Sequence, residues 1–91
     1  MGQKKNDGMR CRLRGKYWRI NRGRIEADKD GWCDASARQI TVRASLQGER
    51  ELDVLLHEML HACLWDLDEE AIMQTASDCA RVLTRLGYHR D

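Results

Sequence analysis

The chain has 91 residues, 42% of them hydrophobic and 34% charged, which suits one small soluble domain. No apolar run approaches the ~20 residues of a membrane span, and no signal peptide precedes the domain, so we expect a cytoplasmic protein without a membrane partner. The four cysteines form no C-x-x-C pair, which argues against a structural zinc knuckle and favours free thiols.

The net charge of +1 hides an uneven distribution of charge along the chain. Residues 1–24 carry nine Lys or Arg and one acid, whereas residues 25–91 carry seven Lys or Arg and fourteen acids. A basic segment on an acidic body indicates an anionic partner, and residues 10–24 are the part expected to contact nucleic acid. A solvated strand face with a soluble tail explains the same charges, because clustering alone identifies no partner.

The N-terminal half of the chain is typical of strands and turns. Residues 1–9 are polar and predicted to be disordered, which leaves residues 10–91 as one domain. From Arg10 to Tyr17, basic side chains alternate with apolar ones, which predicts a strand with one solvated face and a bend at its glycine. Asn21-Arg22-Gly23 then predicts a turn, and Arg24-Ile25-Glu26 a returning strand.

The middle of the chain predicts one more strand. Asp28-Lys29-Asp30-Gly31 is typical of a turn, and residues 32–37 are expected to form an irregular loop. The segment from Arg38 to Arg43 alternates and is rich in β-branched residues, which predicts a strand. We expect this strand to form the edge along which an extended peptide pairs.

Two helices are predicted in the C-terminal half. The first opens at Ser45 or Gln47 and runs to about Trp65, and the second follows Asp68, a good N-cap, over residues 69–86. The chain contains no proline that would interrupt either helix. The expected fold class is therefore α+β, with a small antiparallel sheet packed against two helices.

The first predicted helix carries His57-Glu58-x-x-His61, the H-E-x-x-H pattern. Residues four apart share one helix face, so His57 and His61 can bind one Zn²⁺ at roughly 2.0–2.1 Å. Glu58 lies about 100° around the helix, where its carboxylate can take a proton from zinc-activated water. Because the bare pattern also occurs by chance, two surface histidines on an amphipathic helix are the alternative.

A catalytic zinc usually has three protein ligands, so a third is needed here. Glu69 and Glu70 open the second helix, which must pack back against the first and so bring its start near the histidines. Glu69 lies nearer the edge of the apolar stripe, which makes it one candidate. His89, the remaining histidine, is expected to lie in a loose C-terminal tail.

At these residues the sequence resembles the gluzincins, the thermolysin-like class in which a Glu on the next helix completes the H-E-x-x-H site. Glu70-Ala71-Ile72 resembles the opening of that helix, and on this resemblance Glu70 is the expected third ligand. Gln74 departs from the pattern, since many such enzymes have Asp or Asn one turn after the ligand. The size and the strand-then-helix order resemble small bacterial and phage zincins of the SprT-like or ImmA/IrrE-like kind.

The resemblance implies a minimal zincin fold and a zinc-dependent metallopeptidase that hydrolyses a protein or peptide substrate. Zinc would polarise the scissile carbonyl, and Glu58 would act as general base and then as proton donor to the leaving amine. Tyr17, Tyr88 or His89 is a candidate oxyanion stabiliser, although each also fits a structural or exposed role. Two alternatives stay open: a non-catalytic, zinc-stabilised regulatory or nucleic-acid-binding module, and a metal-free interaction protein.

Overall fold

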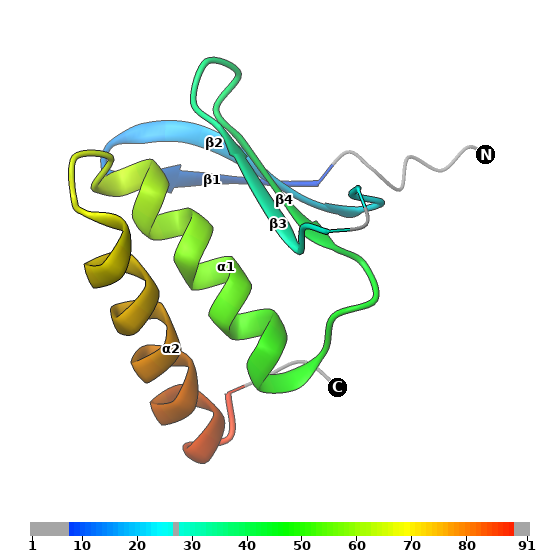
Figure 1. Cartoon of the computed structure of the whole chain (residues 1–91). Helices are drawn as coiled ribbons and strands as arrows, with labels where there is room; N and C mark the ends of the chain where they lie inside the picture. Colours follow the sequence, from blue (N-terminus) through cyan, green and yellow to red (C-terminus); the bar gives the residue numbers. More distant parts are fainter. Residues whose placement is uncertain (1–7, 27, 89–91) are drawn as a thin grey trace.

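The computed structural model describes residues 8–26 and 28–88, which form a four-stranded sheet and two helices (Figure 1). The α+β class predicted from the sequence is confirmed. The strands are β1 (Met9–Leu13), β2 (Lys16–Gly23), β3 (Gly31–Asp34) and β4 (Gln39–Arg43), and the helices are α1 (Gly48–Cys63) and α2 (Glu69–Arg85). Residues 1–7 of the predicted disordered segment and His89 lie outside the described residues.

The sequence predicts a small antiparallel sheet, and the sheet is mixed, because one of its three strand pairs is parallel. Its strand order is β1-β2-β4-β3, in which β1 pairs antiparallel with β2, and β3 with β4, while β2 and β4 run parallel. After β2 the chain passes to the far edge, forms β3 and turns back as β4 between β2 and β3. The strand predicted over Arg38–Arg43 therefore lies inside the sheet, and β3 is the edge strand on that side.

The turn between β1 and β2 falls at Arg14-Gly15, inside what the sequence predicts as one strand. Both residues have positive φ angles, 50° and 82°, as a tight two-residue hairpin turn requires. The predicted turn at residues 21–23 belongs to β2 instead, and residues 24–26 form no strand. β2 is long enough to pair with β1 through its first part and with β4 through its last part, so no turn is needed there.

β3 occupies part of the predicted loop over residues 32–37. A turn organised by Asp34 connects it to β4: the Asp34 carboxylate accepts hydrogen bonds from the backbone N–H groups of Ser36 (3.1 Å) and Ala37 (3.2 Å). Arg38 closes the turn with a φ of 53°. Four residues of strand are too few for an alternating pattern to stand out in the sequence.

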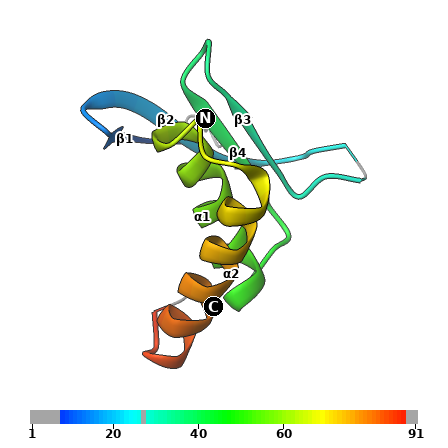
Figure 2. The ribbon, with the colours of Figure 1, turned by 60° about the vertical axis from the view of Figure 1, so that its left-hand side comes forward.

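Hydrophobic packing divides the molecule into three layers. The first core lies between the sheet and α1, where Trp18, Ile40, Val42 and Val54 are at most 7% exposed. The second lies between the helices, where Ile72 and the alanines below it on α2 are buried. Among the described elements α2 packs against α1 and against no strand, and both helices lie on the same side of the sheet (Figure 2). No described helix is long and apolar enough to span a membrane.

Candidate metal centre

The two histidines of the H-E-x-x-H pattern lie together on α1, as their spacing predicts. Their Nε2 atoms are 3.2 Å apart, and the ring centroids are 4.9 Å apart. Both side chains are partly buried, at 23% exposed for His57 and 32% for His61. The pair thus presents two imidazole nitrogens toward one point, in a position that water and a ligand can still reach.

Glu69 is the acidic residue that meets the histidine pair. One of its carboxylate oxygens lies 3.2 Å from Nε2 of His57, and the other lies 3.1 Å from Nε2 of His61. Glu69 is the first residue of α2, and Ile72 and Ala76 follow it at three and seven residues, so all three share the face that packs on α1. The buried stripe of α2 therefore turns Glu69 toward α1.

Glu70, the expected third ligand, is not part of this group. Its carboxylate accepts a hydrogen bond of 3.3 Å from the side-chain amide of Gln74 on the exposed side of α2. Asp68 caps the helix by accepting a hydrogen bond of 2.7 Å from the backbone N–H of Ala71, which fixes where α2 begins and which of the two glutamates faces α1. The resemblance to Glu-Ala-Ile thus selects a residue one position away from the one beside the histidines.

The spacing of the three groups fits a zinc ion. Four ligands at about 2.0 Å in a tetrahedron lie roughly 3.3 Å from one another, close to the separations of 3.1–3.2 Å in this group. Two imidazoles and one carboxylate also match a known donor set of catalytic zinc sites. Among the described residues, His57, His61 and Glu69 are the group of three potential ligands within 4.8 Å of one another. A proton shared between a histidine and Glu69 would join the same atoms without a metal.

Glu58 lies beside this group but makes no hydrogen bond to another described residue. Its side chain is partly buried between α1 and β3. Burial raises the pKa of the Glu58 carboxyl above its ordinary value; the nearby histidines oppose this rise, and Glu69 adds to it. The group is therefore a carboxylate with a strengthened tendency to take up a proton.

Gly31, at the start of β3, sets how closely the sheet approaches Glu58. A Cβ atom at this position would lie 2.7 Å from Cγ1 of Val54 and 2.9 Å from an Oε of Glu58, so no larger residue fits without a shift. The sequence identifies Gly31 only as a turn residue. The role of Gly31 depends on the contact between β3 and α1, and the neighbouring residues in the sequence do not predict this contact.

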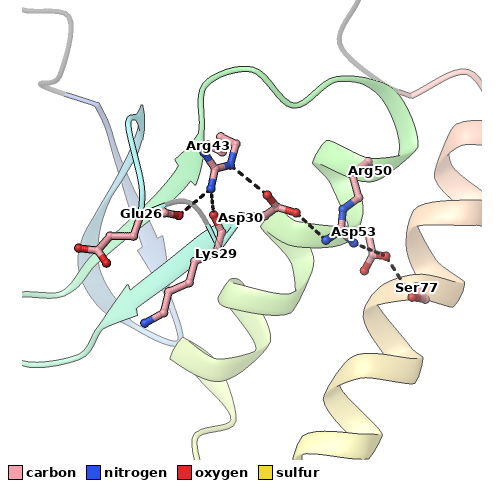
Figure 3. A network of polar contacts seen from close by, with 7 residues as sticks. All are labelled: Glu26, Lys29, Asp30, Arg43, Arg50, Asp53 and Ser77. Carbon is pink, nitrogen blue, oxygen red and sulfur yellow. Dashed lines mark hydrogen bonds and ion pairs between the residues drawn. The ribbon is translucent and has the colours of Figure 1, made fainter.

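A polar network fixes the loop before β3 (Figure 3). Nε of Arg43 donates a hydrogen bond of 3.0 Å to the Asp30 carboxylate, directly before Gly31. The same guanidinium donates to the backbone carbonyls of Lys29 and Glu26, the latter at 2.7 Å. Arg43 thus binds the loop to the end of β4.

The other half of the network reaches both helices. Arg50 on α1 donates a hydrogen bond of 2.7 Å to the second Asp30 oxygen and lies 3.7 Å from Asp53 (Figure 3). The hydroxyl of Ser77 on α2 donates to Asp53 at 3.1 Å. These contacts connect β4, the loop, α1 and α2, and they hold β3 over the face of α1 that carries Glu58.

A cleft of about 1030 Å³ opens along this face. It is bordered by β3 and the loop before it, by α1 with His57, Glu58 and His61, and by the start of α2. Trp65 and Met73 also line it and are 76% and 50% exposed. The sequence assigns no role to either residue, since an exposed tryptophan is recognised only once its surroundings are known.

The candidate oxyanion stabilisers do not meet the site. Tyr17 lies on the uncovered face of the sheet, where the guanidinium of Arg10 lies 4.0 Å from its ring centroid. Tyr88 is exposed beyond the end of α2 and does not line the cleft. His89 lies outside the described residues.

Comparison of the chain with models of protein families, with curated proteins and with solved structures found no match. The likeness to gluzincins is therefore a likeness of motif. Function has to be inferred from the geometry of the site and from the chemistry of its residues.

Proposed function

We propose that this protein is a zinc-dependent metallopeptidase in which His57, His61 and Glu69 hold the metal and Glu58 is the general base. One observation carries the proposal: two imidazole nitrogens and a carboxylate lie 3.1–3.2 Å apart beside an open cleft, next to the partly buried carboxylate of Glu58, which has no hydrogen-bond partner among the described residues. A structural zinc site needs no general base and usually has four protein ligands, so three ligands and an adjacent Glu support catalysis.

A zinc ion bound at this centre supplies Lewis acidity toward a peptide carbonyl and a water molecule. The remaining steps belong to the chain. The Glu58 carboxylate takes a proton as water attacks the carbonyl carbon, and it returns that proton to the amine nitrogen when the C–N bond breaks. Gly31 keeps the β3 backbone against Glu58, which limits hydration of the carboxylate and supports its uptake of a proton.

The substrate in this proposal is an extended peptide. β3 is an edge strand that borders the cleft, so its outer N–H and C=O groups are available for pairing with a further strand. This edge takes the role that the sequence assigns to Arg38–Arg43. The exposed Trp65 and Met73 offer apolar contacts for substrate side chains.

The decisive experiment replaces Glu58 by Gln in the zinc-loaded protein and measures cleavage of a quenched fluorescent peptide library. Loss of the general base should reduce kcat by roughly 10²–10⁴-fold while one zinc per chain is retained. Glu49→Gln, an exposed change in the first turn of the same helix, is the matched control and should cleave like the wild type. Equal cleavage by both variants, or none by the zinc-loaded wild type, would contradict the proposal.

A second candidate is a zinc-stabilised nucleic-acid-binding module without turnover. It is favoured by the uncovered sheet face, where Arg10 of β1 lies opposite Arg19 of β2 and Arg12 lies opposite Tyr17. These side chains point away from the helices and the metal centre. Under this alternative the zinc content and DNA binding of the Glu58→Gln variant equal those of the wild type, and neither protein cleaves peptides.

A further inference from the structure

A second, smaller hollow of about 430 Å³ adjoins the metal centre. It forms where the β1–β2 turn and the β3–β4 turn meet the C-terminal end of α1, and we call it the basic pocket. The basic pocket shares Ala35, His61 and Trp65 with the large cleft. A chain bound across the histidines and past Trp65 would therefore enter it.

The basic pocket is lined by Arg14, Lys16 and Arg38 and by no carboxylate. Arg14 donates a hydrogen bond of 2.8 Å to the backbone carbonyl of Cys63, so its positive charge stabilises the negative C-terminal end of α1. Lys16 and Arg38 form no ion pair with any described carboxylate. Two cations thus remain available to an anionic group that enters the pocket.

The charge of the large cleft is opposite to that of the basic pocket. Its lining includes five carboxylates, from Asp28, Asp30, Asp53, Glu58 and Glu69, against the two cations of Lys29 and Arg50, so the cleft stays negative even with one Zn²⁺ bound. A nucleic-acid strand carries a negative charge on every phosphate and would be repelled along the cleft. A peptide can carry one carboxylate at one position, which suits the basic pocket. It can be neutral or basic elsewhere, which suits the acidic large cleft.

We infer that Lys16 and Arg38 bind a carboxylate of the peptide substrate on the Trp65 side of the metal centre. This inference rests on the proposed function and adds its substrate class, which is peptides with an acidic group on one side of the scissile bond. Trp18 and Trp65 also line the basic pocket and can contact the apolar stem of such a residue. The carboxylate can belong to an Asp or Glu side chain or to the C-terminus of the peptide.

The test uses peptides that differ by one Glu→Gln exchange, scanned through every position, each with an amidated and a free C-terminus. Binding is measured by fluorescence anisotropy on the zinc-loaded Glu58→Gln protein, and cleavage on the wild type. A peptide whose Glu reaches the basic pocket should bind roughly tenfold more tightly than the peptide with Gln at the same position, a difference in binding free energy of about 1.4 kcal/mol. If the tighter binding instead follows the free C-terminus and not the position of Glu, the group that is bound is the terminal carboxylate.

The preference should disappear in Lys16→Gln/Arg38→Gln and persist in Arg24→Gln/Arg85→Gln, which removes two exposed cations elsewhere. Melting curves and zinc content establish that both double variants are folded and loaded. Equal binding of Glu and Gln peptides, equal loss in both double variants, or displacement of the peptide by single-stranded DNA through the same two residues would overturn the inference. If binding depends on the carboxylate but nothing is cleaved, the peptidase proposal fails and the carboxylate site stands.

Discussion

At the scale of single residues, the neighbours Glu69 and Glu70 provide the sharpest comparison. Both lie in the first turn of α2, where a negative charge interacts favourably with the helix dipole, so removing either costs the helix a similar amount. They differ in what their carboxylates contact: two imidazoles for Glu69, and the amide of Gln74 for Glu70. Each is therefore the natural control for the other.

We predict that Glu69→Ala weakens zinc binding by more than about 100-fold. Loss of a residue that only hydrogen-bonds to a metal ligand already lowers metal affinity by roughly 10–100-fold, and loss of a ligand itself should cost more. Glu70→Ala should bind zinc like the wild type. The shift in melting temperature caused by zinc should shrink for Glu69→Ala alone, since each tenfold loss of affinity removes about 1.4 kcal/mol of ligand stabilisation. A zinc titration of both variants checks this, and the reverse order would restore Glu70 as the ligand.

We predict that Gly31→Ala lowers peptide cleavage while zinc stoichiometry stays at one per chain. The three atoms nearest to the added methyl group belong to Val54 and Glu58, so we expect it to displace the base and to leave the ligands in position. Overpacking of this kind costs about 1–3 kcal/mol of unfolding free energy. In a double-mutant cycle, Gly31→Ala with Val54→Ala should be less destabilised than the sum of the single changes. Strict additivity would contradict the contact.

At the scale of elements, the pattern of the sequence predicts α1, α2 and β4 well because each has a sustained period of its own. It fails for β3, whose four residues are too few to establish a period, and for the β1–β2 hairpin, whose two-residue turn at Arg14-Gly15 falls inside an alternating run that is typical of one continuous strand. At the site, the i, i+4 spacing of the histidines predicts their contact, because both residues lie on one helix. The choice between Glu69 and Glu70 depends on how α2 packs on α1.

The loop between β2 and β3 depends on Asp30, and this dependence predicts a response to acid. Hydrogen bonds from Arg50 and then Arg43 hold the pKa of the Asp30 carboxyl below its ordinary value. Its contribution to stability is therefore complete above the pKa of the unfolded chain, roughly 4, and is lost as the pH falls through the folded pKa. The difference in unfolding free energy between the wild type and Asp30→Asn should therefore become smaller as the pH falls through that range.

The measurement is the unfolding free energy of wild type and Asp30→Asn by urea titration between pH 7 and pH 2. Asp66→Asn is the control, because Asp66 is exposed and contacts no cation among the described residues. The difference between wild type and Asp30→Asn should shrink with acid, whereas that for Asp66→Asn should stay small. A difference independent of pH would show that the network in Figure 3 is not electrostatic.

At the scale of the whole molecule, the acidic cleft and a group of arginines on β1 and β2 lie on opposite sides of the sheet. The helices and the cleft lie on one side, and Arg10, Arg12 and Arg19 lie on the other. Figure 2 shows that neither of the two described helices covers this second face. A polyanion can approach there without meeting the carboxylates of the cleft, which makes nucleic-acid binding testable separately from catalysis.

We predict salt-dependent binding of single-stranded DNA to this face. Replacing Arg10 and Arg12 by Gln should reduce the slope of log affinity against log salt by about 1.4, since each phosphate contact contributes roughly 0.7. Arg81→Gln/Arg85→Gln on α2 removes the same charge and should leave the slope unchanged. Anisotropy titrations at several salt concentrations check this. No binding at low salt would leave the face as an ordinary solvated surface.

The position of α2 outside the sheet has a consequence for local unfolding. A helix with one packing partner opens more easily than a strand inside a sheet, so its amide protons should exchange faster than those of β4. A zinc ion bound by two residues of α1 and one of α2 would act as a latch on that opening. Adding a chelator should then accelerate exchange in α2 far more than in β4, and a protease should cut the metal-free chain first between residue 64 and the end of α2.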